Sequence, residues 1–234
     1  MAKKMKTIGI IGGLGPETTA NFYLEVVQLC FERNKMQRPP IIIWNVPLAF
    51  KTEERIITKA VEEEALVPYL VDAAQHLEKG GADFIVIPCN TAHLFIDEVR
   101  KAVKVPVLSI VEESVKFLKK KKVDKIGILS TPATVRNHLY SLEMENNSIE
   151  LVIPNEDQIK IIGSIIHRLV TSNYNEEDKE TLMKIISKLK LRNVEYILLA
   201  CTDLQLIIPK NDSSRIFDTM SILAQASVDM LLID

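Results

Sequence analysis

The stretch Asp83-Phe-Ile-Val-Ile-Pro-Cys89 (DFIVIPC) decides the fold, because it recurs without a gap as Glu195-Tyr-Ile-Leu-Leu-Ala-Cys201 (EYILLAC). Both copies run from an acid through an aromatic residue and three aliphatic residues to a cysteine. Short, continuous apolar runs are typical of strands buried on both faces of a parallel sheet. The repeated stretch therefore predicts two buried parallel strands, each with a cysteine at its carboxyl end.

Two further echoes keep the same order along the chain. Lys6–Gly12 (KTIGIIG) matches Asp124–Ser130 (DKIGILS), and Pro106–Ser109 (PVLS) matches Arg215–Asp218 (RIFD). The offsets are similar to the one between the two cysteines. Three echoes in an unchanged order indicate two α/β lobes that are built alike. The competing interpretation is that buried parallel strands all look aliphatic.

Short apolar runs alternate with longer amphipathic stretches, which predicts parallel sheets with helices on both faces. We assign the first lobe to residues 1–112 and the second to residues 113–234, and the last helix could pack back on the first lobe. Strands are predicted at residues 7–11, 41–45, 83–88, 105–109, 125–130, 150–153, 195–200 and 215–217. Helices are predicted at residues 17–33, 62–79, from Cys89 to about 104, from 133, at 157–171, 177–191 and at the end of the chain. A polar loop is predicted at residues 49–56 (AFKTEERI).

Composition excludes several classes of function. The chain has 234 residues, 47% of them hydrophobic and 26% charged, with a net charge of −2. That balance gives no basic field for nucleic acid or an anionic membrane surface. No stretch has the signature of a secretory signal peptide or reaches the ~20 apolar residues of a membrane span. We therefore expect a cytoplasmic protein with reduced thiols.

The three cysteines are too few and too far apart in sequence for a disulfide framework or a zinc ribbon. Cys30 lies in an amphipathic stretch, where a free cysteine is usually a small core residue. Cys89 and Cys201 differ from it, because Asn-Thr and Thr-Asp follow them directly. A metal site is not expected, since His93 is the only other soft ligand near them in sequence.

A cysteine at the carboxyl end of a parallel strand stands where open α/β sheets bind ligands. Two such cysteines, approaching one carbon from opposite faces, suit racemisation: one removes a proton and the other returns one to the far face. A free thiol has a pKa of ~8.5, near enough to neutrality for either to act as base. Backbone N–H groups of the turn at residues 12–19 (GGLGPETT) and of helix N-termini after the cysteines could hold a substrate carboxylate. Asn90, Thr91 and Thr202 add neutral donors.

The glycine turn has a competing interpretation. Gly13-x-Gly15 after a strand is part of the dinucleotide-binding fingerprint. Thr18 occupies the position of the third glycine, and Asn45 stands where an acidic residue would end the second strand. The turn therefore argues weakly for a nicotinamide enzyme.

Three motifs together resemble the aspartate/glutamate racemase family, and its aspartate racemases most closely. They are IGIIGGLGPETT at Ile8–Thr19, PCNTAH at Pro88–His93 and ACTDL at Ala200–Leu204. The resemblance implies an amino-acid racemase that uses neither pyridoxal phosphate nor metal. It also implies two pseudo-symmetric lobes with the active site between them, and a homodimer.

The resemblance carries over residue by residue. Cys89 and Cys201 match the family's proton-transferring cysteines. Other positions match residues around the substrate: Gly13 and Leu14 in the glycine turn, Asn90, Thr91 and Thr202 beside the cysteines, and Thr131 and Thr134 in a threonine-rich loop. Leu14 stands where methionine is common.

The chain departs from the family where the substrate's side-chain carboxylate is bound. Some aspartate racemases carry an arginine after the second strand and a lysine at the end of the helix that begins here near Asp157. The first region offers Lys51, Thr52 and Arg55, with Lys51 as the predicted ligand, whereas Val170-Thr171-Ser172 has no lysine. Cation–carboxylate recognition separates acidic from neutral substrates strongly. Aspartate is the predicted substrate, and this departure weighs against it.

We therefore predict a cofactor-independent amino-acid racemase acting on aspartate or a related amino acid through the cysteine pair. One alternative is a related carbanion enzyme, such as a glutamate, broad-specificity or hydantoin racemase, a maleate isomerase or an arylmalonate decarboxylase. Another is a non-catalytic binding protein for a small molecule. Binding alone does not require two cysteines, which favours an enzyme.

Overall fold

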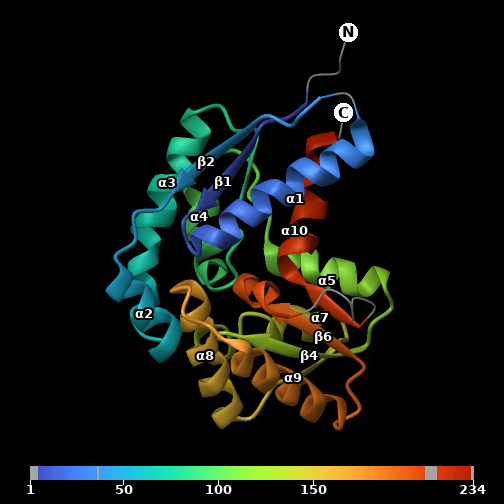
Figure 1. The fold of residues 1–234 in the computed structure, drawn as a ribbon. Helices are drawn as coiled ribbons and strands as arrows, with labels where there is room; N and C mark the ends of the chain where they lie inside the picture. Colours follow the sequence, from blue (N-terminus) through green and yellow to red (C-terminus); the bar gives the residue numbers. More distant parts are fainter. Residues whose placement is uncertain (1–4, 36, 209–214, 233–234) are drawn as a thin grey trace. The chain divides into compact units, whose positions relative to one another are not determined.

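The computed structural model describes residues 5–35, 37–208 and 215–232, which form two compact units. The first unit contains residues up to 48, residues 64–113 and the C-terminal residues from 220. The second contains residues 49–63 and 114–219. Both are α/β units with a parallel sheet (Figure 1).

The sheet of the first unit has the strand order β2-β1-β3, with β1 at Ile8–Gly12, β2 at Ile41–Asn45 and β3 at Phe84–Val86. All pairings are parallel. Ile8, Ile10 and Ile11 of β1 are fully buried, as expected for the central strand of a covered sheet. The apolar runs in the sequence therefore predict these strands correctly.

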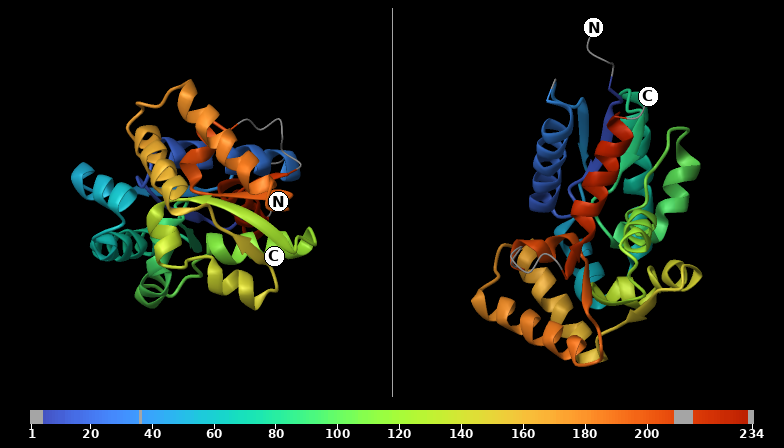
Figure 2. Two further views of the ribbon diagram at one scale, coloured as in Figure 1. Left: turned by 90° about the horizontal axis from the view of Figure 1, so that it is seen from below. Right: turned by 90° about the vertical axis from the view of Figure 1, so that its right-hand side faces the viewer.

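Helices cover both faces of this sheet, with α1 (Pro16–Asn34) on one face and α3 (Val67–Lys79) and α4 (Ile96–Ala102) on the other (Figure 2, right). Pro16 stands in the first turn of α1, where its missing N–H would be unpaired in any case. The final helix α10 (Thr219–Leu232) is joined to α1 by an ion pair between Arg33 and Asp229. A 3-10 turn, η1 (Glu63–Leu66), precedes α3.

The sheet of the second unit has the order β5-β4-β6-β7, again fully parallel. The strands are β4 (Lys125–Ser130), β5 (Glu150–Val152), β6 (Tyr196–Ala200) and β7 (Ile216–Asp218). In each sheet the first strand is central, the second lies on one side and the third on the other. This shared order matches the order of the sequence echoes.

The helices of the second unit include α8 (Glu156–Val170), which packs on β4, and α9 (Glu176–Lys190), which packs on α8. Capping boxes begin both helices, at Asn155 with Gln158 and at Asn175 with Asp178. Their buried faces form the core over β4 and β6 with Leu129, Ile197 and Leu199. The remaining helices are α5 (Ile110–Lys120), which begins in the first unit, α6 (Pro132–Arg136) and α7 (Ser141–Asn146).

Residues 50–59 form the helix α2 (Phe50–Lys59), so the predicted polar loop at residues 49–56 is wrong. The helix belongs to the second unit and packs on α6 and α8. Gly163 of α8 permits the close approach of α6, because a Cβ there would lie 2.8 Å from Pro132 Cγ, whereas its contact with the Ile57 carbonyl oxygen of α2, at 3.5 Å, would be ordinary. Ile56 is the buried residue of this helix. Because most of the other residues of α2 are charged or polar, its short apolar face does not produce a helical pattern in the sequence.

The strand predicted at residues 105–109 is reduced to one parallel bridge between Ile85 and Val107. The Ile85 N–H donates to the Pro106 carbonyl at 2.8 Å, and the Leu108 N–H donates to the Ile85 carbonyl at 3.0 Å. Proline has no N–H to extend the ladder.

The helices predicted directly after the cysteines begin as 3-10 turns, η2 (Thr91–Phe95) before α4 and η3 (Thr202–Leu206) after Cys201. Each cysteine is therefore followed by the start of a 3-10 turn instead of the N-terminus of an α-helix. Within the described ranges, every helix is too short or too polar to cross a bilayer.

Candidate active site

The two cysteines stand at equivalent places in their units, each just beyond the third strand. Ser130 pairs with Ala200 at the ends of β4 and β6. The next residues along these parallel strands are Thr131 and Cys201, which therefore leave the sheet at the same edge. In the first unit Ile10 pairs with Val86 at the end of β3, and Cys89 follows three residues later, where its N–H donates to the Ile87 carbonyl at 2.8 Å.

Cys89 is partly exposed, and a buried histidine fixes the turn that carries it. His93 Nδ1 lies 2.8 Å from the Cys89 carbonyl oxygen, and the Ile110 N–H donates to His93 Nε2 at 2.9 Å. The second bond makes Nε2 an acceptor, so Nδ1 carries the proton and donates to Cys89. The imidazole therefore links the cysteine turn to the start of α5.

Burial lowers the pKa of His93 to about 4, because the ring has little solvent to stabilise the imidazolium. The backbone hydrogen bonds at Cys89 and Leu108 oppose this effect without reversing it. At neutral pH the ring is uncharged and used at both nitrogens. It is suited to positioning Cys89 rather than to exchanging protons.

Cys201 has a different partner. Its thiol is buried and donates to the Asp203 carboxylate, with Sγ 3.7 Å from Oδ2. Asp203 is itself 7% exposed. A carboxylate in contact with a thiol can accept its proton. Asp203 can therefore act as the base that converts the Cys201 thiol into a thiolate.

The glycine turn after β1 is held in a left-handed conformation. Gly13 has φ 84°, and a Cβ on it would lie 2.8 Å from Asn45 Oδ1 and 2.9 Å from the Val46 nitrogen. The position therefore requires glycine. Its N–H donates to Thr19 Oγ1 at 3.0 Å, so this donor is engaged within the turn.

Thr131 and Thr134 meet at the carboxyl end of β4. Thr131 caps α6: its Oγ1 accepts the Thr134 N–H at 3.2 Å and donates to Thr134 Oγ1 at 3.0 Å. Both side chains are buried. The two hydroxyls form one polar group at the same sheet edge as Cys201.

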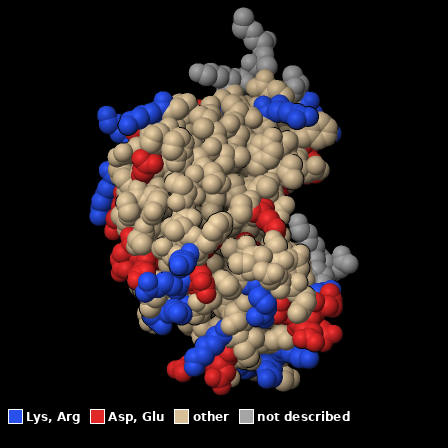
Figure 3. All heavy atoms as spheres, turned by 60° about the vertical axis from the view of Figure 1, so that its left-hand side comes forward, with Lys and Arg blue, Asp and Glu red and all other residues tan. Residues whose placement is uncertain are grey.

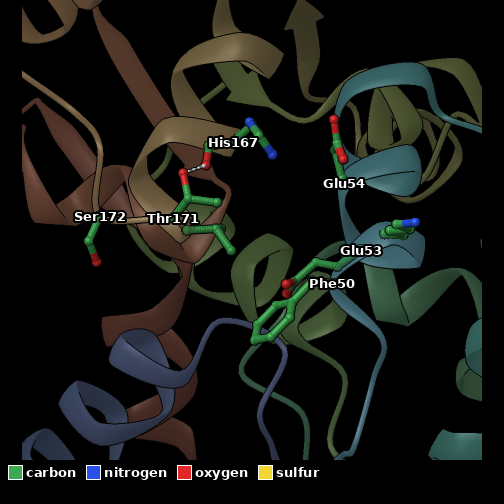
Figure 4. A pocket seen from close by; sticks show the side chains of 8 residues that line it. Phe50, Glu53, Glu54, His167, Thr171 and Ser172 are labelled. Carbon is green, nitrogen blue, oxygen red and sulfur yellow. Dashed lines mark hydrogen bonds between the residues drawn. The ribbon is translucent and has the colours of Figure 1, made fainter.

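A cavity of about 450 Å³ lies between α2 and α8 in the second unit. Figure 4 shows the Glu53 carboxylate beside the Phe50 ring, with Glu54 and His167 on opposite sides of the opening. Thr171 Oγ1 donates to the His167 carbonyl at 2.9 Å. The full lining comprises Phe50, Lys51, Glu53, Glu54, His167, Val170, Thr171 and Ser172.

Comparison with known proteins gives the site its context. The Asp/Glu/hydantoin racemase family model matches residues 11–227. The chain belongs to this family. The broad specificity amino-acid racemase RacX of Bacillus subtilis (strain 168) is 29% identical over 233 residues, covering 96% of this chain and 98% of RacX.

Two solved racemase-type structures share the fold over nearly their whole lengths. An aspartate racemase homologue from Pyrococcus horikoshii OT3 has a TM-score of 0.78 and 29% identity, covering 97% of this chain and 99% of that one. The aspartate racemase of Picrophilus torridus has a TM-score of 0.77 and 26% identity, covering 96% and 94%. The chain is accordingly an amino-acid racemase of the Asp/Glu/hydantoin racemase family.

The residues that the racemase resemblance selects fall into two groups. Gly13, Leu14, Cys89, Asn90 and Thr91 belong to the first unit, and Lys51, Thr131, Thr134, Cys201 and Thr202 belong to the second. Except for Lys51, Cys89 and partly exposed Gly13, these side chains or positions are buried. Lys51 is exposed on α2 at the cavity.

Two acidic residues were missed as candidates. Asp203 is not among the predicted site residues, although an acidic residue two positions after a cysteine is a usable signal in the sequence. Glu53 lies in the segment where the sequence analysis offers only Lys51, Thr52 and Arg55. Across the described parts of the chain, no cluster of three histidine, cysteine or carboxylate side chains could hold a metal ion.

Proposed function

We propose that this racemase inverts the α-carbon of a free amino acid by a two-base reaction between Cys89 and Cys201. In one direction the thiolate of one cysteine takes the Cα proton and becomes a thiol. The thiol of the other cysteine gives its proton to the opposite face of the carbanion and becomes a thiolate. The reverse reaction exchanges the roles, and no cofactor enters the balance.

The single observation that carries this proposal is the equivalent position of two cysteines beyond the third strands of two like sheets. A buried structural cysteine has no reason to recur at the same strand end with polar residues after it. Membership of a racemase family supports the same chemistry.

The carbanion needs stabilising, since a proton beside a carboxylate is very weakly acidic. We propose that Asn90, Thr91 and Thr202, next to the two cysteines, bind the α-carboxylate and amino group. Thr131 and Thr134 add hydroxyls at the Cys201 edge of the second sheet. Preorganised donors of this kind stabilise developing charge most effectively where water is excluded.

Asp203 extends the proposal at Cys201. Its carboxylate receives the hydrogen bond from the thiol and can hold the proton while Cys201 acts as base. In the first unit the residue two positions after the cysteine is Thr91, so the two half-reactions have different proton partners.

The test is α-carbon exchange in deuterium oxide without added cofactor. Single enantiomers of aspartate, glutamate, lysine and neutral amino acids are incubated with the protein and followed by NMR and optical rotation. We expect exchange together with loss of rotation for at least one amino acid. Absence of both for every amino acid would reject the proposal, and a panel lacking free amino groups would then test hydantoin or maleate chemistry.

The substrate's side chain is the finer question. Aspartate is the prediction from the family resemblance, with Lys51 as the cation for its distal carboxylate. Arg55, the other cation considered, pairs with Glu62 at 2.6 Å. Only Lys51 of the two lines the cavity, beside two glutamates, so acidic side chains are not the best match.

We also propose a homodimer formed by the first unit. Leu24 and Phe31 of α1 are 59% and 63% exposed, and Ile43 of the edge strand β2 is 42% exposed. Figure 3 shows a face of this unit nearly without charged side chains. A second copy would cover this apolar helix face and the open strand edge. Sedimentation should show a dimer, and Phe31→Glu should yield monomer; a monomeric wild type would reject the proposal.

A further inference from the structure

The cavity between α2 and α8 lies in the same neighbourhood as the Cys201 end of the second sheet. The turn η3, which begins immediately after Cys201, packs against α8. The helix α2 packs against both α8 and α6, the helix capped by Thr131. Asp203 also acts electrostatically on Glu53 in the cavity. These contacts connect the walls of the cavity to the turn that begins after Cys201, so the side chain of a substrate held at Cys201 could extend toward it.

The lining combines apolar and acidic groups. Phe50 and Val170 offer an aromatic and an aliphatic surface, and Glu53 and Glu54 offer two carboxylates against the single lysine, Lys51. The Glu53 carboxylate lies beside the Phe50 ring in Figure 4. A lysine or ornithine side chain has matching parts, because its methylene stem packs on apolar surface and its ammonium group binds carboxylates and aromatic faces.

The surroundings of Glu53 disfavour the ionised form of its carboxyl group. Burial, and secondarily the negative charge of Asp203, raise the pKa of Glu53 to about 7. A cation in the cavity would relieve both effects, whereas a second carboxylate would add to them.

We infer that this cavity selects an amino acid with an elongated, positively charged side chain, with Glu53 as the residue that binds its cationic end. The inference rests on the proposed racemase function and names its substrate class. It reverses the charge expected for aspartate at this place. Glu53 is a specificity residue, and the proton transfers remain with the cysteines.

Lys51 is the counter-argument, because its ammonium group could bind an acidic side chain. Lys51 is exposed, and the lining residues next to it in the sequence are an aromatic residue, Phe50, and an acidic one, Glu53. The mixed lining therefore carries one positive charge and two carboxylates before Asp203 is considered.

The experiment measures kcat and KM for L-lysine, L-ornithine, L-arginine, L-aspartate, L-glutamate and L-leucine with the wild type, Glu53→Gln and Glu53→Lys. We expect kcat/KM for the basic amino acids to exceed that for aspartate by at least about 10-fold. Glu53→Gln should lower kcat/KM for lysine about 10- to 100-fold, mainly through KM, and change leucine less than about 3-fold. Glu53→Lys should shift the preference toward glutamate.

Glu180→Gln, an exposed change on α9, is the matched control and should leave all substrates unaffected. Circular dichroism melts of each variant separate misfolding from altered specificity. A wild type that prefers aspartate, or a Glu53→Gln variant that loses lysine and leucine equally, would overturn the inference while leaving the racemase proposal intact. If no amino acid exchanges at all, the racemase proposal itself fails.

Discussion

The turns that carry Cys89 and Cys201 have the same scaffold and different proton partners. Each cysteine follows the third strand of a parallel sheet and leads into a 3-10 turn. At Cys89 a neutral histidine holds the backbone carbonyl, whereas at Cys201 a carboxylate holds the thiol itself. The first arrangement positions a cysteine, and the second can also take its proton.

The two units share the features that their sheets require and differ in side chains that lie outside the sheets. Strand order and the place of the cysteine are kept in both units, because each sheet needs its buried parallel strands. The side chains two and four residues after the cysteine are not part of either sheet. They can diverge so that each thiol is adjusted to its own half-reaction.

Removing either thiol should have the largest effect on this comparison. Cys89→Ala and Cys201→Ala should each lower racemisation by at least about 10³-fold, because each removes one general acid–base group. One-sided exchange should survive: each variant should still exchange the Cα proton of one enantiomer in deuterium oxide. The two variants should retain opposite enantiomers, as measured by NMR.

Cys30→Ala is the control, since Cys30 is fully buried in α1 and has Met5 Sδ within 4.0 Å of its sulfur. It should retain racemisation and lose about 1 kcal/mol of stability through lost packing. If all three variants behave alike, or both active-site variants exchange the same enantiomer, the two-base comparison is wrong.

The sequence predicts the strands better than the helices that surround them. The limits of β2 and β4 agree with the prediction, because each strand is one short apolar run in the sequence, whether it is buried like β4 or lies at the sheet edge like β2. The helix α2 is not predicted, because its apolar face is only one turn long and becomes buried only through packing on α8. The bridge at Val107 was overpredicted because Pro106 limits its ladder.

The candidate site divides in the same way. Because the stretch that ends in Cys89 recurs at Cys201, the sequence alone predicts these two cysteines and their neighbours as site residues. Asp203 and Glu53 come together through the packing of η3 and α2 on α8, which no local pattern records. The prediction of a loop at residues 49–56 therefore gives no indication that acidic residues of this segment line a cavity.

His93 should give the next largest effect, on stability and its pH dependence. Its pKa is about 4 in the folded protein against about 6.5 unfolded, so the unfolded chain binds the proton first as pH falls. The contribution is complete above pH 6.5 and is lost as pH falls through 4, by up to about 3 kcal/mol. Urea unfolding at pH 7.5 and pH 5.0 measures it.

His93→Gln sharpens this result, because an amide can donate to the Cys89 carbonyl and accept from Ile110 without titrating. Between pH 7.5 and 5.0 the wild type should lose about 2 kcal/mol more than the variant. Equal losses in the two proteins would show that His93 does not control acid stability.

Asp203→Asn should affect one half-reaction more than the other. The amide keeps the shape but cannot take the thiol proton, so exchange of the enantiomer deprotonated by Cys201 should slow about 30-fold, near 2 kcal/mol. Exchange of the other enantiomer should change less. Initial deuterium incorporation from each pure enantiomer measures the ratio, and equal slowing would place Asp203 in substrate binding instead.

The smallest predicted difference compares two glycines at the same place in the central strands. A Cβ on Gly9 would lie 2.9 Å from Ala82 Cβ, and one on Gly127 would lie 2.9 Å from Ile197 Cδ1. The first neighbour is fixed to the backbone, whereas the second is the end of a side chain that can turn away. Gly9→Ala should therefore destabilise the protein by about 2 kcal/mol and Gly127→Ala by less than about 1 kcal/mol. Urea unfolding of the two variants measures the difference in the free energy of unfolding. A larger loss for Gly127→Ala would mean that the side chains around Gly127 cannot move aside to admit the added methyl group.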